Sequence, residues 1–209
     1  MNNSVNYLWN HGTEGNWLEA LKQYDKIIDL RSIEVQGIEG FMAQLQAEDV
    51  KNMSVLEFYS FLYEQYFVWV FTQKNRLAST RKHLRKYVDE NRMFELEDIQ
   101  KRLFSTDHSN IKECLKIAME VRGLGIAGAT GLLAVLFPHD FGTVNEPIVE
   151  VIRTIDGINY GYELIKMKPS TAIIVTEIFR EKAKELNRKF NTNFWTPRKI
   201  DKVLWACVR

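Results

Sequence analysis

Apolar residues along this chain recur at spacings of three and four, which is the pattern of helices that bury one face. The clearest stripe comprises Trp17, Leu21, Tyr24 and Ile28. The same spacing predicts further helices over residues 55–71, 77–88, 109–121, 126–137, 146–155 and 170–188, with a last helix after Thr196. Only residues 142–144 and 158–162 suggest extended backbone, and both stretches are too short to build a sheet. We therefore predict an all-α fold in one domain over residues 1–209, with room for two helical lobes and a cleft between them.

Several residues mark where these helices begin. Ser54 followed by Glu57 fits a capping box, in which the two residues satisfy each other's backbone N–H groups. Ser170 is expected to cap the long helix that follows it. Thr196 is expected to cap the last helix, with Pro197 at its first position, where a missing N–H costs nothing.

The composition is that of an ordinary soluble protein, with 45% hydrophobic and 26% charged residues among 209. Cys114 and Cys207 form no spaced framework, which indicates free thiols in a reducing compartment. The chain has no CxxC or HxxxH pair, so we expect neither a metal site nor a cofactor. Residues 1–6 do not have the pattern of a signal peptide, and the longest uncharged run, residues 123–138, is too short to span a bilayer. We therefore expect a cytoplasmic protein with no membrane partner.

The net charge is only +1, but the charges are unevenly distributed. Residues 74–86 carry six cations and no acid, and residues 180–209 carry nine cations against three acids. On a helix, four cations of the first run would form one strip: Arg81, Lys82, Arg85 and Lys86. A further patch in the last helix comprises Arg198, Lys199 and Lys202. A nearly neutral chain can therefore still present a basic face to a polyanion.

The most informative stretch is residues 121–138 (VRGLGIAGATGLLAVLFP), where glycines separate two predicted helices. Its G-x-G-x-x-G pattern matches a dinucleotide-binding loop only superficially, because that loop follows a β-strand and here a helical pattern comes first. A hairpin between two helices explains the glycines better, since Gly123 and Gly125 can supply positive φ or a close backbone approach. The small residues after them would let the second helix pack closely against the preceding one. The free N–H groups at the start of that second helix would then bind a phosphate.

Residues 122–130 (RGLGIAGAT), the apolar helix after them, Phe137 with Pro138, and residues 141–145 (FGTVN) resemble the helix-hairpin-helix base-excision DNA glycosylase superfamily. The similarity covers about residues 111–155 and implies a glycosylase-like helical fold, with the hairpin element at about 111–137. It also implies DNA as the partner, held by sequence-independent contacts to its phosphates. The residues assigned to this contact are Arg122, Gly123, Leu124, Gly125, Ile126, Ala127 and Gly128, together with Arg81, Lys82 and Arg85.

The chain departs from this family at the catalytic positions. Family members place an aspartate where this chain has Asn145, and an amide can neither act as a base nor stabilise positive charge on the sugar as a carboxylate does. Bifunctional members place a nucleophilic lysine where this chain has Ala127. Asn145 is instead expected to cap the helix that starts at Glu146. The candidates for a catalytic role are Asn145 itself, Glu146 and Asp140.

Three hypotheses follow from these residues. The first, which we favour, is a DNA-binding protein of glycosylase-like fold that contacts the phosphate backbone without glycosylase activity. The second is an active DNA glycosylase with a non-standard acid, which requires Glu146 or Asp140 to point into a base-sized pocket beside the hairpin. The third is a helical protein-interaction domain with no nucleic-acid role, in which the hairpin merely packs two helices together.

Overall fold

The computed structural model describes residues 2–158, 164 and 166–208 of the chain. Every regular element within these ranges is helical, which confirms the all-α prediction. The elements are α1 (Asn2–His11), α2 (Glu14–Asp29), α3 (Ile33–Gln44), α4 (Ala47–Lys51), α5 (Val55–Ser60), the π-helical turn η1 (Phe61–Tyr66), α6 (Phe67–Val70), α7 (Lys74–Asp89), α8 (Met93–Ser105), α9 (Ile111–Glu120), α10 (Ile126–Leu136), α11 (Glu146–Arg153), α12 (Pro169–Phe190) and α13 (Pro197–Cys207). Residues 142–144 form a loop, and most of the stretch 158–162 lies outside the described residues.

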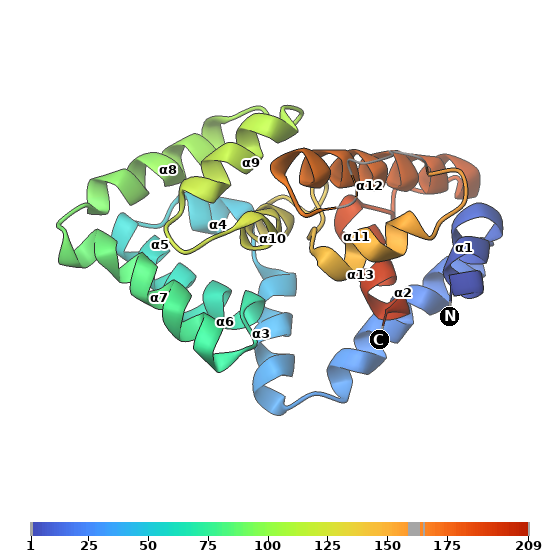
Figure 1. Ribbon diagram of the computed structural model, residues 1–209, viewed down its shortest axis with the longest axis horizontal. Helices are drawn as coiled ribbons and strands as arrows, with labels where there is room; N and C mark the ends of the chain where they lie inside the picture. The colour runs from blue at the N-terminus through green and yellow to red at the C-terminus, as the bar shows by residue number, and fades with distance from the viewer. Residues whose placement is uncertain (1, 159–163, 165, 209) are drawn as a thin grey trace.

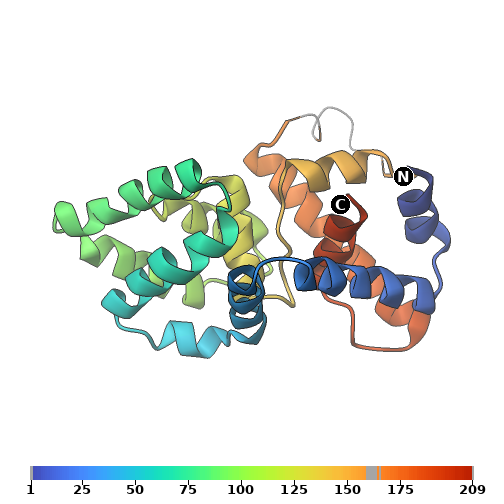
Figure 2. The same cartoon turned by 90° about the horizontal axis from the view of Figure 1, so that it is seen from below.

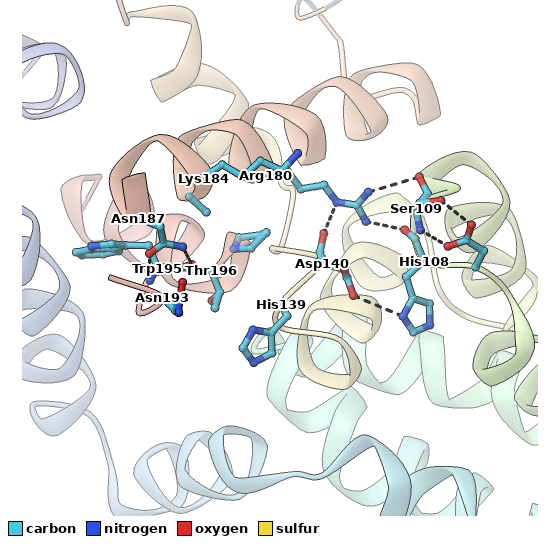
Figure 3. A pocket seen from close by; sticks show the side chains of 13 residues that line it. His108, Ser109, His139, Asp140, Arg180, Lys184, Asn187, Asn193, Trp195 and Thr196 are labelled. Atoms are coloured by element: carbon cyan, nitrogen blue, oxygen red, sulfur yellow. Dashed lines mark hydrogen bonds and ion pairs between the residues drawn. The ribbon is translucent and has the colours of Figure 1, made fainter. Parts of the chain in front are cut away.

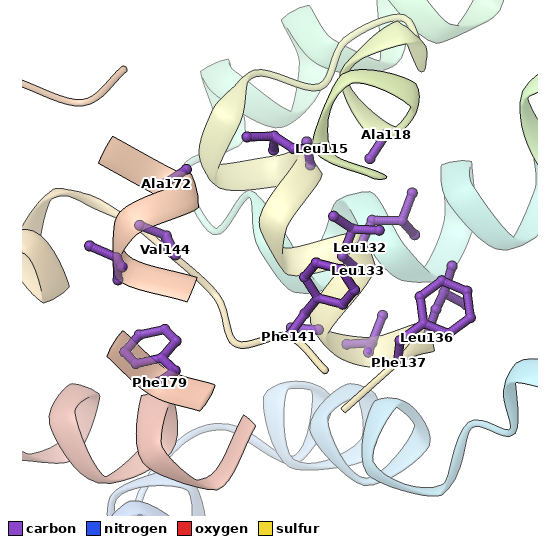
Figure 4. Close-up of a cluster of buried hydrophobic side chains, with 14 of the residues drawn as sticks. Leu115, Ala118, Leu132, Leu133, Leu136, Phe137, Phe141, Val144, Ala172 and Phe179 are labelled. Carbon is purple, nitrogen blue, oxygen red and sulfur yellow. The ribbon is translucent and has the colours of Figure 1, made fainter. Parts of the chain in front are cut away.

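The helices form two groups that lie side by side (Figures 1 and 2). One group runs from α3 to α10, and the other comprises α1, α2, α11, α12 and α13. The chain passes from one group to the other after α2 and again after α10. Buried side chains continue across this junction, because Phe141 lies between Leu133 of α10 and Phe179 of α12 (Figure 4). The two groups therefore share one hydrophobic core.

The predicted helix starts are correct at two of the three positions. The Ser54 hydroxyl accepts from the backbone N–H of Glu57 at 3.3 Å and the Glu57 carboxylate accepts from the backbone N–H of Ser54 at 2.8 Å, which confirms the capping box. Thr196 caps α13 through the N–H of Lys199 at 3.3 Å. Ser170 is not a cap: α12 already begins at Pro169, one residue earlier. Proline is favoured at that first position because its φ is preset and no N–H is needed there.

The glycines of α10 allow a close approach by a second neighbour besides α9. A Cβ at Gly131 would lie 2.8 Å from the Tyr66 hydroxyl, and the same hydroxyl donates a hydrogen bond to the carbonyl of Gly128. A Cβ at Gly128 would meet Leu124 of the turn at 2.9 Å and Phe71 at 3.4 Å. Helix α10 also packs against α9, as predicted, but the sequence pattern did not indicate that Gly131 faces η1 and α6.

The structure also describes the helix lengths, the clusters of metal-ligand residue types and the two cysteines. None of the helices in the described ranges is long and apolar enough to cross a bilayer. Within those same ranges, no group of three or more His, Cys, Asp or Glu side chains is placed to bind a metal ion. Cys114 is buried and Cys207 half-buried, and both are free thiols.

Candidate nucleic-acid interface

The hairpin is a tight turn between α9 and α10 in which the two predicted glycines play different roles. Gly123 has φ of +97°, and a Cβ there would lie 2.7 Å from the carbonyl oxygen of Thr80 in α7. Both observations explain why this position needs glycine. Gly125 has φ of −92°, and a Cβ there would meet no atom within 4 Å. The prediction of a special backbone conformation is thus correct for Gly123 and wrong for Gly125.

Gly125 stands at the N-cap of α10 and is exposed to solvent. No side chain caps this end of the helix. The first hydrogen bond of the helix runs from the N–H of Ala129 to the carbonyl of Gly125 at 2.8 Å. The N–H groups of Ile126, Ala127 and Gly128 therefore have no partner within the helix at the positive end of its dipole; Ile126 and Ala127 are half-buried, and Gly128 is buried.

Helix α7 lies directly against the hairpin, a placement that sequence spacing could not predict. Thr80 meets Gly123, and the Tyr87 hydroxyl donates to the carbonyl of Glu120 while it accepts from the N–H of Arg122, both at 3.1 Å. Hydrogen bonds to Tyr87 thus attach the turn to α7 at both Glu120 and Arg122. The longest acid-free run of cations in the chain therefore adjoins the exposed end of α10.

Arg76 of α7 is linked to the open helix end through the ring of Phe71. Its guanidinium lies 5.5 Å from the ring centroid of Phe71, and the tip of that ring lies 3.4 Å from where a Cβ of Gly128 would be. Arg76 is four residues from Thr80, so both occupy the same side of α7. Sequence reasoning placed Arg76 in the basic run but not among the site residues, because only the position of Phe71 indicates its role.

The other α7 cations differ in their surroundings. Lys82 and Arg85 are exposed, as are Lys74 and Lys86. Arg81 is held in place by Tyr63, because its Nε donates to the carbonyl of Tyr63 at 2.9 Å and its guanidinium lies 4.4 Å from the Tyr63 ring centroid. Across the described part of the chain, none of the six cations of α7 has a carboxylate oxygen within 4.0 Å. Their positive charge is therefore not neutralised by the protein.

Arg122 braces the hairpin. Its guanidinium pairs with the carboxylates of Glu90 at 2.7 Å and Glu95 at 3.2 Å and lies 4.8 Å from the ring centroid of Tyr87. The hydrogen bond from Arg122 lowers the pKa of Glu90 below its ordinary value. With two carboxylates already opposite it, Arg122 attaches the turn to the start of α8.

The segment that resembles the family's catalytic region lies beside the first turns of α10. The N–H of Val144 donates to the Thr130 hydroxyl at 3.0 Å. The next residue, Asn145, caps α11, as predicted, by accepting from the N–H of Ile148 at 3.2 Å. Glu146 is exposed. The amide of Asn145 is thus occupied with a helix end, and neither Asn145 nor Glu146 lines either of the two cavities of about 610 and 430 Å³ in the described structure.

Asp140 lies elsewhere, in the cavity of about 610 Å³ between the α8–α9 loop and α12 (Figure 3). Its carboxylate lies 3.5 Å from Nδ1 of His108, and its carbonyl accepts from Nε of Arg180 at 2.7 Å. This cavity adjoins the loop after the C-terminal end of α10, whereas the hairpin is at the N-terminal end. Asp140 therefore does not point into a pocket beside the hairpin.

Comparison with known protein families, curated proteins and solved structures gave no match. The interpretation of the site therefore rests on its own geometry: an uncapped helix end, an exposed glycine in front of it, and an adjacent helix whose cations face no carboxylate within the described residues. Such an arrangement can bind an anion through backbone donors and hold a polyanion by its field.

Proposed function

We propose that this protein binds the phosphate backbone of DNA through the start of α10 and the cations of α7. The observation that carries the proposal is the exposed, uncapped start of α10 at Gly125, next to a helix whose cations have no carboxylate partner in the described structure. A Cβ at Gly125 would meet no atom of its own chain, so nothing inside the protein requires a glycine there. A close approach by a phosphate would require one.

The proposed contact is independent of base sequence. Backbone N–H groups and flanking cations contact phosphate oxygens, which are the same at every step of a duplex. Arg76 supplies a cation beside the helix end, and Lys82 and Arg85 add to the positive field. Each phosphate neutralised releases condensed counterions, so affinity should fall steeply as salt rises.

Base excision is not part of the proposed function. Asn145 caps α11, and an amide cannot perform the task of the family's aspartate. Asp140 and Glu146, the two acids considered as substitutes, lie in a distant cavity and on the exposed surface respectively. The protein therefore holds DNA without cutting the glycosidic bond.

Gly125→Asp tests the proposal because it should keep or raise the stability of the fold while it weakens DNA binding. Aspartate is a preferred N-cap residue and favours the positive end of the dipole, so the free energy of unfolding should stay unchanged or rise by a few tenths of a kcal/mol. A carboxylate at this position occupies the donors and repels phosphate. Affinity for a labelled duplex, measured by fluorescence anisotropy at low salt, should fall about tenfold or more, the value of one missing hydrogen bond to a charged group.

Gly15→Asp is the matched control. Gly15 is an exposed glycine in the first turn of α2, so the variant adds the same charge at a comparable helix end. It should bind the duplex like the wild type. The proposal is wrong if Gly125→Asp retains full affinity, or if Gly15→Asp weakens binding as much.

A further inference from the structure

A second cavity, of about 430 Å³, lies between α2, α3, the end of α10 and α13. We call it the α13 cavity. It adjoins Ala134, Val135 and Pro138, at the opposite end of α10 from the hairpin. A helix rises about 1.5 Å per residue, so this cavity lies roughly 12 Å along α10 from the proposed DNA contact. It is therefore a separate site, and its occupancy does not depend on DNA binding.

The walls of the α13 cavity are apolar, and its cations come from one helix. Leu21, Met42, Leu45 and Val135 contribute the apolar walls, with Phe194 at the edge. Arg198, Lys199 and Lys202 face the cavity from the first two turns of α13. Two acids, Asp25 and Glu39, also line it. These three cations, which the sequence suggests as a surface patch, thus line one cavity.

Glu39 is surrounded by donors and cations of its own protein. Its carboxylate accepts from the Tyr24 hydroxyl at 2.7 Å and from the Trp69 indole at 2.6 Å, and it lies 3.3 Å from the Lys202 ammonium and 3.8 Å from the Arg198 guanidinium. The charge of Glu39 is thus compensated within the protein. Arg198 is likewise satisfied, since it also pairs with Asp201 and donates to the Thr143 hydroxyl at 3.1 Å.

The two lysines retain donors. Among the acids of the described structure, Lys202 contacts only Glu39, and Lys199 donates to the carbonyl of Phe194 at 2.8 Å. The Lys199 ammonium also lies 3.3 Å from the ring centroid of Phe194 and the Lys202 ammonium 4.5 Å from that of Tyr24, but each carries three N–H donors, so both keep donors for a bound anion. Burial and then the neighbouring Arg198 lower the pKa of Lys202, and burial and then Lys202 lower the pKa of Lys199. With Arg198 paired to Asp201 and Lys202 beside Glu39, Lys199 is the cation of the cavity that has no carboxylate within 4.0 Å in the described structure, and a bound anion would compensate its charge.

We propose that the α13 cavity binds a small organic anion, with a carboxylate or phosphate group on Lys199 and Lys202 and an apolar body against Leu21, Met42 and Val135. An inorganic ion alone would leave most of the volume and all of the apolar wall unused. Cavities of several hundred Å³ with apolar walls and a few convergent polar groups are typical of small-molecule sites. Phe194, whose side chain is 40% exposed, is placed to cover the apolar body.

The probes for the test are phenylacetate, phenyl phosphate and the uncharged 2-phenylethanol, titrated by isothermal calorimetry. At least one of the two anions should bind the wild type, and 2-phenylethanol should bind about tenfold more weakly or not at all, the difference expected when a hydrogen bond to a charged group is missing. Lys199→Gln should weaken the anion about tenfold. Lys199 does not contact Glu39, so this variant should keep its fold, as circular dichroism can verify.

Ala43→Trp provides a second, independent variant. Ala43 lines the cavity and is exposed, so a large side chain there fills the space without removing any charge. It should abolish anion binding, whereas Gly125→Asp should leave it intact, and excess duplex DNA should not displace the probe. Equal affinity for 2-phenylethanol and phenylacetate, no binding of either anion at millimolar concentration, or unchanged binding by Ala43→Trp would each overturn the proposal.

Discussion

Helices α7 and α13 both carry dense runs of Lys and Arg, yet the protein uses the two runs differently. On α7 the cations Lys82 and Arg85 are exposed and have no carboxylate opposite them in the described structure. On α13 the side chain of Arg198 is only 11% exposed and is paired with Asp201 and Glu39. The partner Glu39 comes from α3, far away in the sequence and in the other group of helices.

The difference shows that a basic run indicates a binding face only where it lacks counterions. Buried cations require paired acids, because an uncompensated charge in the interior is costly. Exposed cations require none and remain available to an external polyanion. We therefore expect changes at Arg198 of α13 or its acid partners to alter stability, and changes at α7 to alter DNA binding.

The largest expected effect is the loss of stability when Glu39, the acid partner of α13, is replaced. Glu39→Gln leaves Lys202 without its carboxylate and Arg198 with Asp201 alone in a largely buried setting, so we expect the free energy of unfolding to fall by about 3 kcal/mol. Chemical denaturation measures this change. Glu48→Gln, which breaks the exposed pair with Lys51, is the control and should cost less than about 1 kcal/mol. Equal costs in the two variants would contradict the comparison.

The pH dependence of the same pair sharpens this prediction. Burial alone would raise the pKa of Glu39, but Arg198, Lys202 and the donors Trp69 and Tyr24 lower it overall from 4.5. A carboxyl with a lowered pKa in the folded state stabilises the fold above its unfolded pKa and loses that contribution as pH falls through the folded one. The stability difference between wild type and Glu39→Gln should therefore stay constant above about pH 4.5 and shrink below it.

Neutralisation of α7 should have the next largest effect, on binding alone. The variant replaces Arg76, Lys82, Arg85 and Lys86 with Gln. We expect affinity for a duplex at low salt to fall about 100-fold, and the slope of log affinity against log salt to decrease by about 0.9 for each phosphate that the protein no longer neutralises. Stability should change by no more than about 0.5 kcal/mol, because these side chains are exposed.

A matched variant separates the placement of charge from its amount. Lys51, Lys101, Lys116 and Lys184 are exposed lysines that already pair with acids on their own helices. Their replacement by Gln removes the same four charges and should change duplex affinity far less. If this control weakens binding as much as the α7 variant does, net charge rather than the α7 surface explains binding.

The smallest expected effect is the difference in stability between variants of the two hairpin glycines. Gly123→Ala places a Cβ 2.7 Å from the Thr80 carbonyl at φ of +97°, and should cost about 2 kcal/mol of stability. Gly125→Ala meets nothing within 4 Å and should cost no more than about 1 kcal/mol, from a poorer N-cap. Thermal unfolding measures both. An equal cost at the two positions would show that Gly125 has an internal role after all.

Much of the candidate site is predictable from sequence, and the exceptions share one cause. The turn at Gly123 and the cap by Asn145 follow from residues close together in the chain, so local patterns indicate them. The ion pair between Arg122 and Glu90 and the approach of Phe71 to Gly128 join residues that are distant in the chain. Spacing carries no information about such contacts.

By itself, the sequence determined that the chain is helical, where several helices begin, and where a glycine turn joins α9 to α10. These features depend on apolar periodicity and caps, which act within a few residues. Only the tertiary structure decided which basic run meets the hairpin and which is buried. That choice depends on where acids such as Glu39 are brought by packing, because the cost of an unpaired buried charge is set by three-dimensional neighbours and not by sequence position.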